Sequence, residues 1–219
     1  MKTTRWWPIL IYKALFLAAA LTLAAACQAK SQSSVPEAVV TRVVDGDTVH
    51  LDTGERVRLV GIDTPELEKE GRPAEFLAHK AKAELARMTQ GKKIRLEYDQ
   101  LRYDHYGRLL AYLFLPDGTF VNAEMVRQGW ARVYLIPPNL RFKEELVQAQ
   151  RQALETRHGI WQQALKQDES HYLANQHTFR FHRPNCKLAQ KISKANLISF
   201  NSLLQAYQAG FSPCRSCKP

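Results

Sequence analysis

The chain has 219 residues, of which 45% are apolar and 24% are charged, and its formal net charge is +10. This composition is typical of a globular protein and excludes a disordered chain, and the length suits one ordinary domain with a small appendage. The positive charge is compatible with a polyanionic partner such as nucleic acid but does not require one.

Residues 1–26 have the pattern of an export signal. Three basic residues accompany a run of thirteen small or apolar residues, 14–26, which ends directly before Cys27. The run is shorter than the roughly 18 residues of a membrane-spanning helix, so it favours a signal peptide. Two outcomes stay open: lipid attachment at Cys27, as in a bacterial membrane-anchored lipoprotein, or simple cleavage after an Ala-x-Ala. In both cases, residues 27–37 form a polar tether. The protein is then exported, and it is periplasmic, anchored to a membrane or secreted.

The remaining chain predicts an α+β fold. Alternating β-branched and polar residues predict five strands: 38–44, 47–51, 56–62, 93–99 and 108–115. Apolar residues at helical spacing predict three helices: 71–88, about 122–128 and about 140–157. We therefore expect a five-stranded barrel with packed helices over residues 38–165. The cysteine-rich residues 171–219 form a second, smaller module.

The stretch 43–66, "VVDGDTVHLDTGERVRLVGIDTPE", carries more charge than two hairpins need. Turn chemistry accounts for Asp45 and its neighbours, because Asp and Gly favour tight turns. It does not account for Asp63 and Glu66, or for Arg58 in a run of Val and Leu.

These residue types suit the hydrolysis of a phosphodiester. Oxygen ligands hold a hard cation that neutralises phosphate oxygens, arginines donate bidentate hydrogen bonds, and a carboxylate orients or deprotonates water. The chain supplies five such side chains: Asp47, Arg58, Asp63, Glu66 and Arg108. Strand alternation lets Arg58 point toward the turn that presents Asp47. Taken singly, each acid is also a common turn residue or surface charge.

Four motifs in chain order resemble the staphylococcal nuclease (thermonuclease) family: "VDGDTV" at 44–49, "RLVGIDTPE" at 58–66, "YGR" at 106–108 and "VNAEMVRQGWARV" at 121–133. The resemblance covers about 38–161 and implies an OB-fold, calcium-dependent nuclease that cleaves DNA and RNA and leaves 3′-phosphates. By position, it implies that the carboxylates of Asp47 and Asp63 and the backbone carbonyl of Thr64 hold calcium.

The same resemblance assigns the remaining site residues. It implies that Arg58 and Arg108 bind the phosphate and stabilise its five-coordinate transition state, while Glu66 acts as general base on the attacking water. Tyr106 and Tyr134 match tyrosines that contact nucleotides in the family, although tyrosines also pack barrels routinely.

Three departures from the family concern substrate contacts. The loop at 67–72 is shorter and less lysine-rich, Ile136 stands where the family has a second stacking tyrosine, and His105 replaces a lysine. The chemistry is retained, but the preference between DNA and RNA stays open.

The C-terminal module has the spacing of a zinc site. His182 and Cys186 form one close pair and Cys214 and Cys217 another, which suits tetrahedral zinc when the chain folds the pairs together. His177 is a less favoured ligand. The alternative, a disulfide between Cys214 and Cys217, leaves Cys186 unpaired and His182 unexplained.

This module resembles the zinc domain at the start of the Ada family of alkylation-repair proteins. His182 replaces the methyl-accepting cysteine of that family, so the resemblance implies structural zinc that assists nucleic-acid binding and does not imply methyl transfer. Five basic residues form either a basic face for nucleic acid or a solvated surface: Lys187, Lys191, Lys194, Arg215 and Lys218.

The sequence therefore predicts an exported, monomeric nuclease with a zinc module, and it identifies no protein partner. One rival is a noncatalytic, nucleic-acid-binding OB-fold protein of the cell envelope, and another is an adaptor whose zinc module docks an envelope protein. Retention of all five charged residues named above argues against the first rival.

Overall fold

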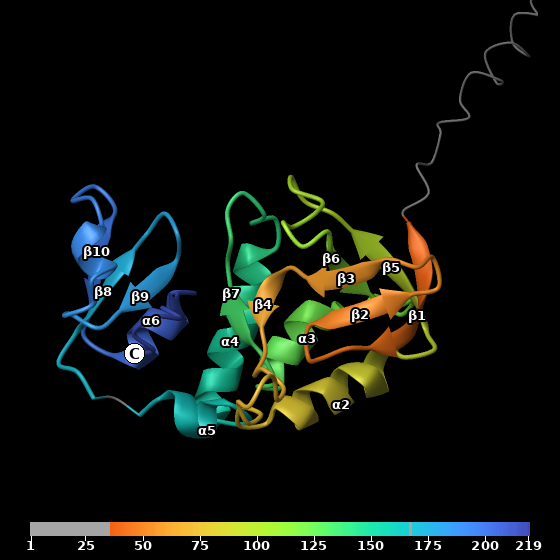
Figure 1. The fold of residues 1–219 in the computed structure, drawn as a ribbon, viewed down its shortest axis with the longest axis horizontal. Helices are drawn as coiled ribbons and strands as arrows, with labels where there is room; N and C mark the ends of the chain where they lie inside the picture. Colours follow the sequence, from red (N-terminus) through yellow and green to blue (C-terminus); the bar gives the residue numbers. More distant parts are fainter. Residues whose placement is uncertain (1–35, 167) are drawn as a thin grey trace, which may run out of the picture. The chain divides into compact units, whose positions relative to one another are not determined.

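The computed structural model describes residues 36–166 and 168–219 (Figure 1). The expected signal peptide at 1–26, the lipidation candidate Cys27 and most of the tether at 27–37 lie outside the described residues. Within the described ranges, no helix is both long enough and apolar enough to cross a membrane.

Five strands close into a barrel in the order β1-β2-β3-β6-β5. Their bounds are β1 Glu37–Val43, β2 Thr48–Leu51, β3 Arg56–Leu59, β5 Lys93–Glu97 and β6 Leu109–Phe114. The β3–β6 pair is parallel and the other neighbours are antiparallel. Along β3, Val57 and Leu59 are fully buried in the core while Arg58 lies between them on the outer face. The barrel confirms the expected fold class.

The third expected strand, 56–62, is divided into two strands. After β3 the chain turns at Gly61, whose φ of +79° suits glycine, and enters β4, Gly61–Asp63. Strand β4 leaves the barrel and pairs antiparallel with β7, Arg132–Tyr134, which the sequence pattern did not predict. Their register sets Asp63 opposite Arg132 and Gly61 opposite Tyr134, so two side chains of β7 lie beside the charged stretch.

Three helices accompany the barrel: α2 Ala78–Thr89, α3 Val121–Arg127 and α4 Lys143–Thr156 (Figure 1). Helix α2 begins at Ala78 and not at 71, because Leu77 has a left-handed backbone with φ of 67°. The preceding segment forms a loop in which the backbone N–H of Glu75 donates to the carbonyl of Glu66 at 2.9 Å.

The C-terminal module is a four-stranded sheet in the order β10-β8-β9-β11, with one helix and one short 3-10 segment. The short helix α5, Trp161–Ala164, precedes the module. The elements of the module are β8 Tyr172–Asn175, β9 Arg180–His182, η1 Ala189–Lys191, β10 Leu197–Phe200, α6 Leu203–Gln208 and β11 Ser212–Pro213. Strand β11 runs parallel to β9, so the second cysteine pair follows directly after the strand beside the first pair.

This module shares a hydrophobic core with α4 and α5. One buried cluster joins Leu154 and Trp161 to Phe181 and Tyr207, and the rings of Trp161 and Tyr207 meet edge to face at 4.9 Å. The buried side chain of Gln150 accepts a hydrogen bond from the N–H of Val133 at 2.7 Å and donates to the carbonyl of Tyr207 at 2.6 Å. Helix α4 of the first domain therefore also packs against the module.

Candidate functional site

The turn between β1 and β2 presents Asp47 to the start of the 64–77 loop. The N–H of Asp47 donates to the carboxylate of Asp45 at 3.1 Å, which closes the turn. A Cβ on Gly46 would lie 2.7 Å from Oγ1 of Thr64, so only glycine permits this approach. The close approach allows Thr64 to donate from its N–H and its hydroxyl to Oδ2 of Asp47, both at 3.2 Å.

The carboxylate of Asp47 is nearly enclosed. The residue is 7% exposed, and Nη2 of Arg58 lies 2.9 Å from its Oδ2. Burial raises the pKa of Asp47 to about 7, with the charges of Asp45 and Asp63 adding to the shift and Arg58 opposing it. A carboxylate in this state gains stabilisation from any further cation placed beside it.

Asp63, at the end of β4, is the second buried carboxylate. Its neighbours are Arg58 at 3.9 Å, Nε of Arg132 at 3.2 Å and Nη2 of Arg215 at 2.8 Å. The guanidinium of Arg58 therefore lies between Asp47 and Asp63. Its two terminal nitrogens also donate to the carbonyls of residues 59 and 62, which fix its orientation.

The sequence pattern did not identify Arg132 and Arg215 as site residues. Arg132 reaches Asp63 because the two residues face each other across the β4–β7 pair. Predicting the short strand at 132–134 would have placed Arg132 near Asp63, but the sequence pattern did not indicate this strand. Arg215 was recognised only as one of several basic residues of the module, and nothing in its local sequence points to Asp63.

Arg108 lies just before β6 and is held by Asp104. The Nε and Nη2 atoms of Arg108 both lie 2.7 Å from Oδ2 of Asp104, whose Oδ1 also accepts from the N–H of Arg108 at 3.0 Å. Leu110 is the strand partner of Arg58, so alternation puts Arg108 on the same outer face, two residues before that partner. Among the described residues, no hydrogen bond or ion pair joins Arg108 directly to Asp47 or Asp63.

Glu66 is exposed on the loop that follows Thr64. Its backbone is fixed, because its N–H donates to the carboxylate of Glu75 at 3.1 Å and its carbonyl accepts from the N–H of the same residue. The side chain of Glu66 therefore extends toward solvent from a loop segment that these two hydrogen bonds hold, two residues after Thr64.

The two candidate stacking tyrosines differ in their surroundings. Tyr106 is 73% exposed and lies against His105, with ring centroids 3.7 Å apart. Tyr134 is partly buried, and the guanidinium of Arg180 lies 3.6 Å from its ring centroid while that of Arg215 lies 5.0 Å from it. Tyr134 therefore joins the barrel site to two arginines of the C-terminal module.

The four expected zinc ligands converge. One ligand atom from each of His182, Cys186, Cys214 and Cys217 lies within 4.8 Å of the others, and the three cysteines are free thiols. The expected disulfide alternative is therefore not the state of the described chain.

The chemistry of the donors also fits a zinc ion. Burial, with a contribution from Arg180, lowers the pKa of His182 and keeps the imidazole neutral, the form that binds metal. The N–H of Arg183 donates to Sγ of Cys217 at 3.4 Å, and the N–H of Ser216 donates to Sγ of Cys214 at 3.4 Å. Such N–H donors stabilise thiolate sulfur.

Comparison with known families separates the chain into two overlapping parts. The pattern of the "Staphylococcal nuclease homologue" family matches residues 56–163, and that of the "Metal binding domain of Ada" matches residues 159–219. The overlap falls at α5, where the barrel domain and the module share a core.

Curated relatives, among them three with named nuclease activities, match the first part. A thermonuclease of Staphylococcus intermedius is 39% identical over 127 residues, which cover 57% of this chain and 75% of the relative. A thermonuclease of Staphylococcus hyicus is 38% identical over 125 residues, covering 56% of this chain and 73% of the relative. Endonuclease YncB of Bacillus subtilis (strain 168) is 30% identical over 137 residues, covering 60% of this chain and 64% of the relative.

Proposed function

Because this chain belongs to the staphylococcal nuclease family, we propose that it is a metal-dependent phosphodiesterase that cleaves nucleic acid at the cluster around Asp47 and Asp63. The observation that carries the proposal is the pair of buried carboxylates with the guanidinium of Arg58 between them. Burying two carboxylates side by side is costly, and such clusters occur preferentially at functional sites.

The oxygen donors of this cluster fit calcium. The carboxylates of Asp47 and Asp63 and the backbone carbonyl of Thr64 would hold the ion, since calcium prefers carboxylate and carbonyl oxygens. The raised pKa of Asp47 supports this assignment, because a cation would relieve the cost of burying its charge. When bound, calcium neutralises negative charge on phosphate oxygens.

The two family-matched arginines bind the phosphate. Arg58 is fixed by carbonyls and Arg108 by Asp104, so both guanidiniums are oriented before substrate arrives. Preorganised donors aimed at developing charge contribute most when the transition state forms, and loss of one commonly costs about 10²–10³ in turnover. Arg58 and Arg108 therefore stabilise the five-coordinate phosphorus.

Glu66 acts on the attacking water. It is an exposed carboxylate on a loop whose backbone is held by Glu75, which leaves the side chain free to accept a proton from water. Departure of the 5′ oxygen would leave 3′-phosphate ends. Tyr134 lies beside Arg215, and the ring centroid of Tyr106 lies 5.4 Å from the guanidinium of Arg108. Both tyrosines would contact the nucleotides of DNA or RNA.

The rest of the chain supports this activity. Structural zinc at the four C-terminal ligands would hold the module together. The export pattern at 1–26 and Cys27 favours a periplasmic or membrane-anchored enzyme that degrades nucleic acid outside the cytoplasm. Fractionation of cells that carry a Cys27→Ala variant, together with labelled palmitate, tests the lipid anchor.

The activity is tested with the purified chain from residue 28 onward, on single-stranded DNA, double-stranded DNA and RNA. Calcium, magnesium and chelator are compared, and Glu66→Gln is measured beside Glu68→Gln, an exposed acid of the same loop. We expect calcium-dependent cleavage that Glu66→Gln lowers by about 10²–10⁴ while Glu68→Gln leaves it unchanged. Tight binding without cleavage in any metal would instead assign the chain to noncatalytic OB-fold proteins.

A further inference from the structure

The C-terminal module is held against the barrel domain by hydrogen bonds and close packing. Besides the hydrogen bond from Gln150 to the carbonyl of Tyr207, Nε of Arg151 donates to the carbonyl of Gln208 at 2.9 Å. A Cβ on Gly210 would lie 2.6 Å from Cγ2 of Val147, so the two segments are in close contact there. Residues of the module that face the barrel domain therefore have fixed positions.

Arg215 lies on the turn between two zinc ligands. It follows Cys214 directly, and the N–H of Lys218 donates to the carbonyl of Cys214 at 3.0 Å to close the turn. The N–H of Cys214 donates to the carbonyl of Phe181 in β9 at 2.8 Å, which ties the turn to the first pair of ligands. Any metal bound by Cys214 and Cys217 restrains Arg215 as well.

This turn brings Arg215 to the proposed reaction site. Its Nη2 donates to Oδ1 of Asp63 at 2.8 Å, and its guanidinium lies 5.0 Å from the ring centroid of Tyr134. The charge of Glu66 also acts on it. Of the five basic residues of the module named from the sequence, Arg215 is the one that forms an ion pair with the barrel site within the described ranges.

The donors of Arg215 remain open to a ligand. Its side chain is 65% exposed, and across residues 36–166 and 168–219 Asp63 is the hydrogen-bond acceptor recorded for it. A guanidinium has five N–H donors in a fork that matches phosphate, so most of them face solvent here. An ionised carboxylate has about four acceptor positions, so Asp63 can bind Arg215 and a cation together.

Guanidiniums from both parts of the chain surround Asp63. Arg58 and Arg132 come from the barrel domain, and Arg215 comes from the module. Acidic groups, among them Asp47, offset their charge at the same place. A backbone phosphate of a nucleic acid held there would therefore meet guanidinium donors from both parts of the chain.

We propose that Arg215 is a substrate-binding residue of the nuclease, whose guanidinium contacts a backbone phosphate of the nucleic acid held beside Asp63 and Tyr134. The zinc module is then part of the substrate site, and its metal positions Arg215. This inference rests on the proposed function, because it assigns a further residue to the same site.

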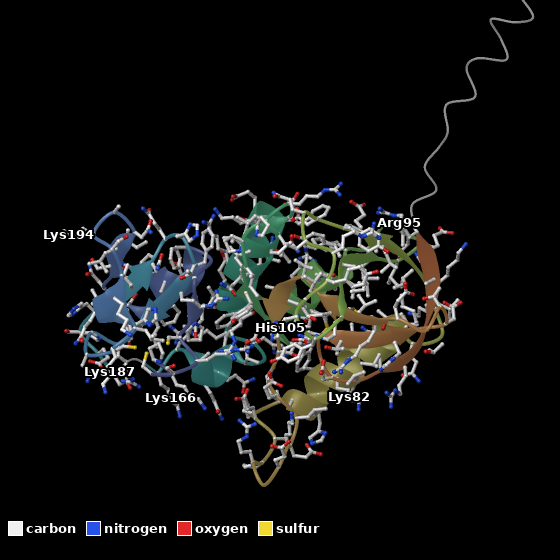
Figure 2. All side chains as sticks on the ribbon, turned by 45° about the horizontal axis from the view of Figure 1, so that its top comes forward. Lys82, Arg95, His105, Lys166, Lys187 and Lys194 are labelled. Atoms are coloured by element: carbon white, nitrogen blue, oxygen red, sulfur yellow. The ribbon has the colours of Figure 1, made fainter. Side chains whose placement is uncertain are left out.

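The test uses the full chain carrying Glu66→Gln, with calcium present and a fluorescein-labelled single-stranded oligonucleotide. Anisotropy gives Kd at several salt concentrations for Arg215→Ala and for Lys194→Ala. Lys194 is an exposed basic residue that precedes β10 at the outer edge of the module (Figure 2). We expect Arg215→Ala to raise Kd about 5–10-fold and to lower the slope of log K against log salt by about 0.7, the loss of one phosphate contact.

Lys194→Ala should leave both the Kd and the salt dependence of binding unchanged. The inference is overturned if Arg215→Ala binds like the parent chain, or if Lys194→Ala weakens binding equally. It is also overturned if Arg215→Ala with Glu66 intact needs less calcium and cleaves faster, because Arg215 would then compete with the cation.

Zinc content and the thermal midpoint check folding, and Arg215→Gln replaces Arg215→Ala if that variant loses zinc. A parent chain with Glu66 that cleaves no nucleic acid refutes the proposed function instead.

Discussion

Nη2 of Arg215 lies 2.8 Å from Oδ1 of Asp63, although 152 positions separate the two residues in the chain. One residue follows a predicted zinc ligand and the other is a predicted calcium ligand. The two metal sites proposed for this protein are therefore connected through a single side-chain hydrogen bond, and a change at the zinc site should be measurable at the nuclease site.

Loss of a zinc ligand should weaken nucleic-acid binding. We expect His182→Ala to lower zinc affinity by about 100-fold or more, and to raise the oligonucleotide Kd to the value of Arg215→Ala, because the 214–217 turn loses its restraint. Adding Arg215→Ala to His182→Ala should then change Kd little further, since both act on one interaction. Metal analysis and anisotropy on the four chains of this cycle provide the measurement.

The control for this cycle is His182→Cys, which replaces one good zinc ligand by another. It should retain zinc and the Kd of the parent chain. Full additivity of His182→Ala and Arg215→Ala would contradict the connection, because it would mean that zinc acts on binding through some other part of the module.

Asp104 should act as a positioning residue for Arg108. Asp104→Asn keeps an oxygen for the N–H groups of Tyr106 and Arg108 but loses the charge-assisted pair with the guanidinium. We expect kcat to fall about 10–100-fold with little change in KM, because misplacement of a catalytic group affects mainly the transition state. Steady-state kinetics separate the two constants. Asp117→Asn is the matched control, since Asp117 accepts from the N–H of Thr119 in a similar turn but pairs with no arginine in the described chain.

The stability contributed by Asp104 should depend on pH. Burial alone would raise the pKa of Asp104, but the hydrogen bonds from the backbone and side chain of Arg108 lower it. A carboxyl whose pKa is lower in the folded state stabilises the fold above its unfolded pKa of about 3.9, and this contribution is lost as the pH falls through the folded value. Urea unfolding should therefore find Asp104→Asn less stable than the parent chain at pH 6. The difference should shrink below about pH 4, and a difference that grew at low pH would contradict the assignment.

Gln150 should be essential for docking the module. Gln150→Leu removes the partners of the N–H of Val133 and the carbonyl of Tyr207, both in a buried setting. Leaving a buried polar group unpaired costs about 1–3 kcal/mol, so we expect the free energy of unfolding to fall by about 2–5 kcal/mol in urea titrations. Gln152→Leu, two residues further along the same helix and exposed, should change it by less than about 0.5 kcal/mol. Equal effects of the two substitutions would show that Gln150 makes no special contribution.

The sequence predicted the features that depend on neighbours in the chain. The alternation of strand residues gave the barrel strands, apart from the break at Gly61 that creates β4. The motifs around Asp47, Arg58 and Asp63 predicted a cluster that the fold does bring together. The spacing of two ligand pairs was enough to predict a zinc site, because each pair lies on one turn of chain and the ion itself selects their geometry.

Only the tertiary structure decided how the two parts of the chain meet. Arg132 reaches Asp63 through the pairing of β4 with β7, a strand too short for a clear pattern. Arg215 reaches it because α4 and α6 pack together and fix the turn that follows β11. Local periodicity reports which side of an element is buried, but it does not report which distant element covers that side. The membership of Arg215 in the site therefore depends on packing between segments that the sequence treats as independent.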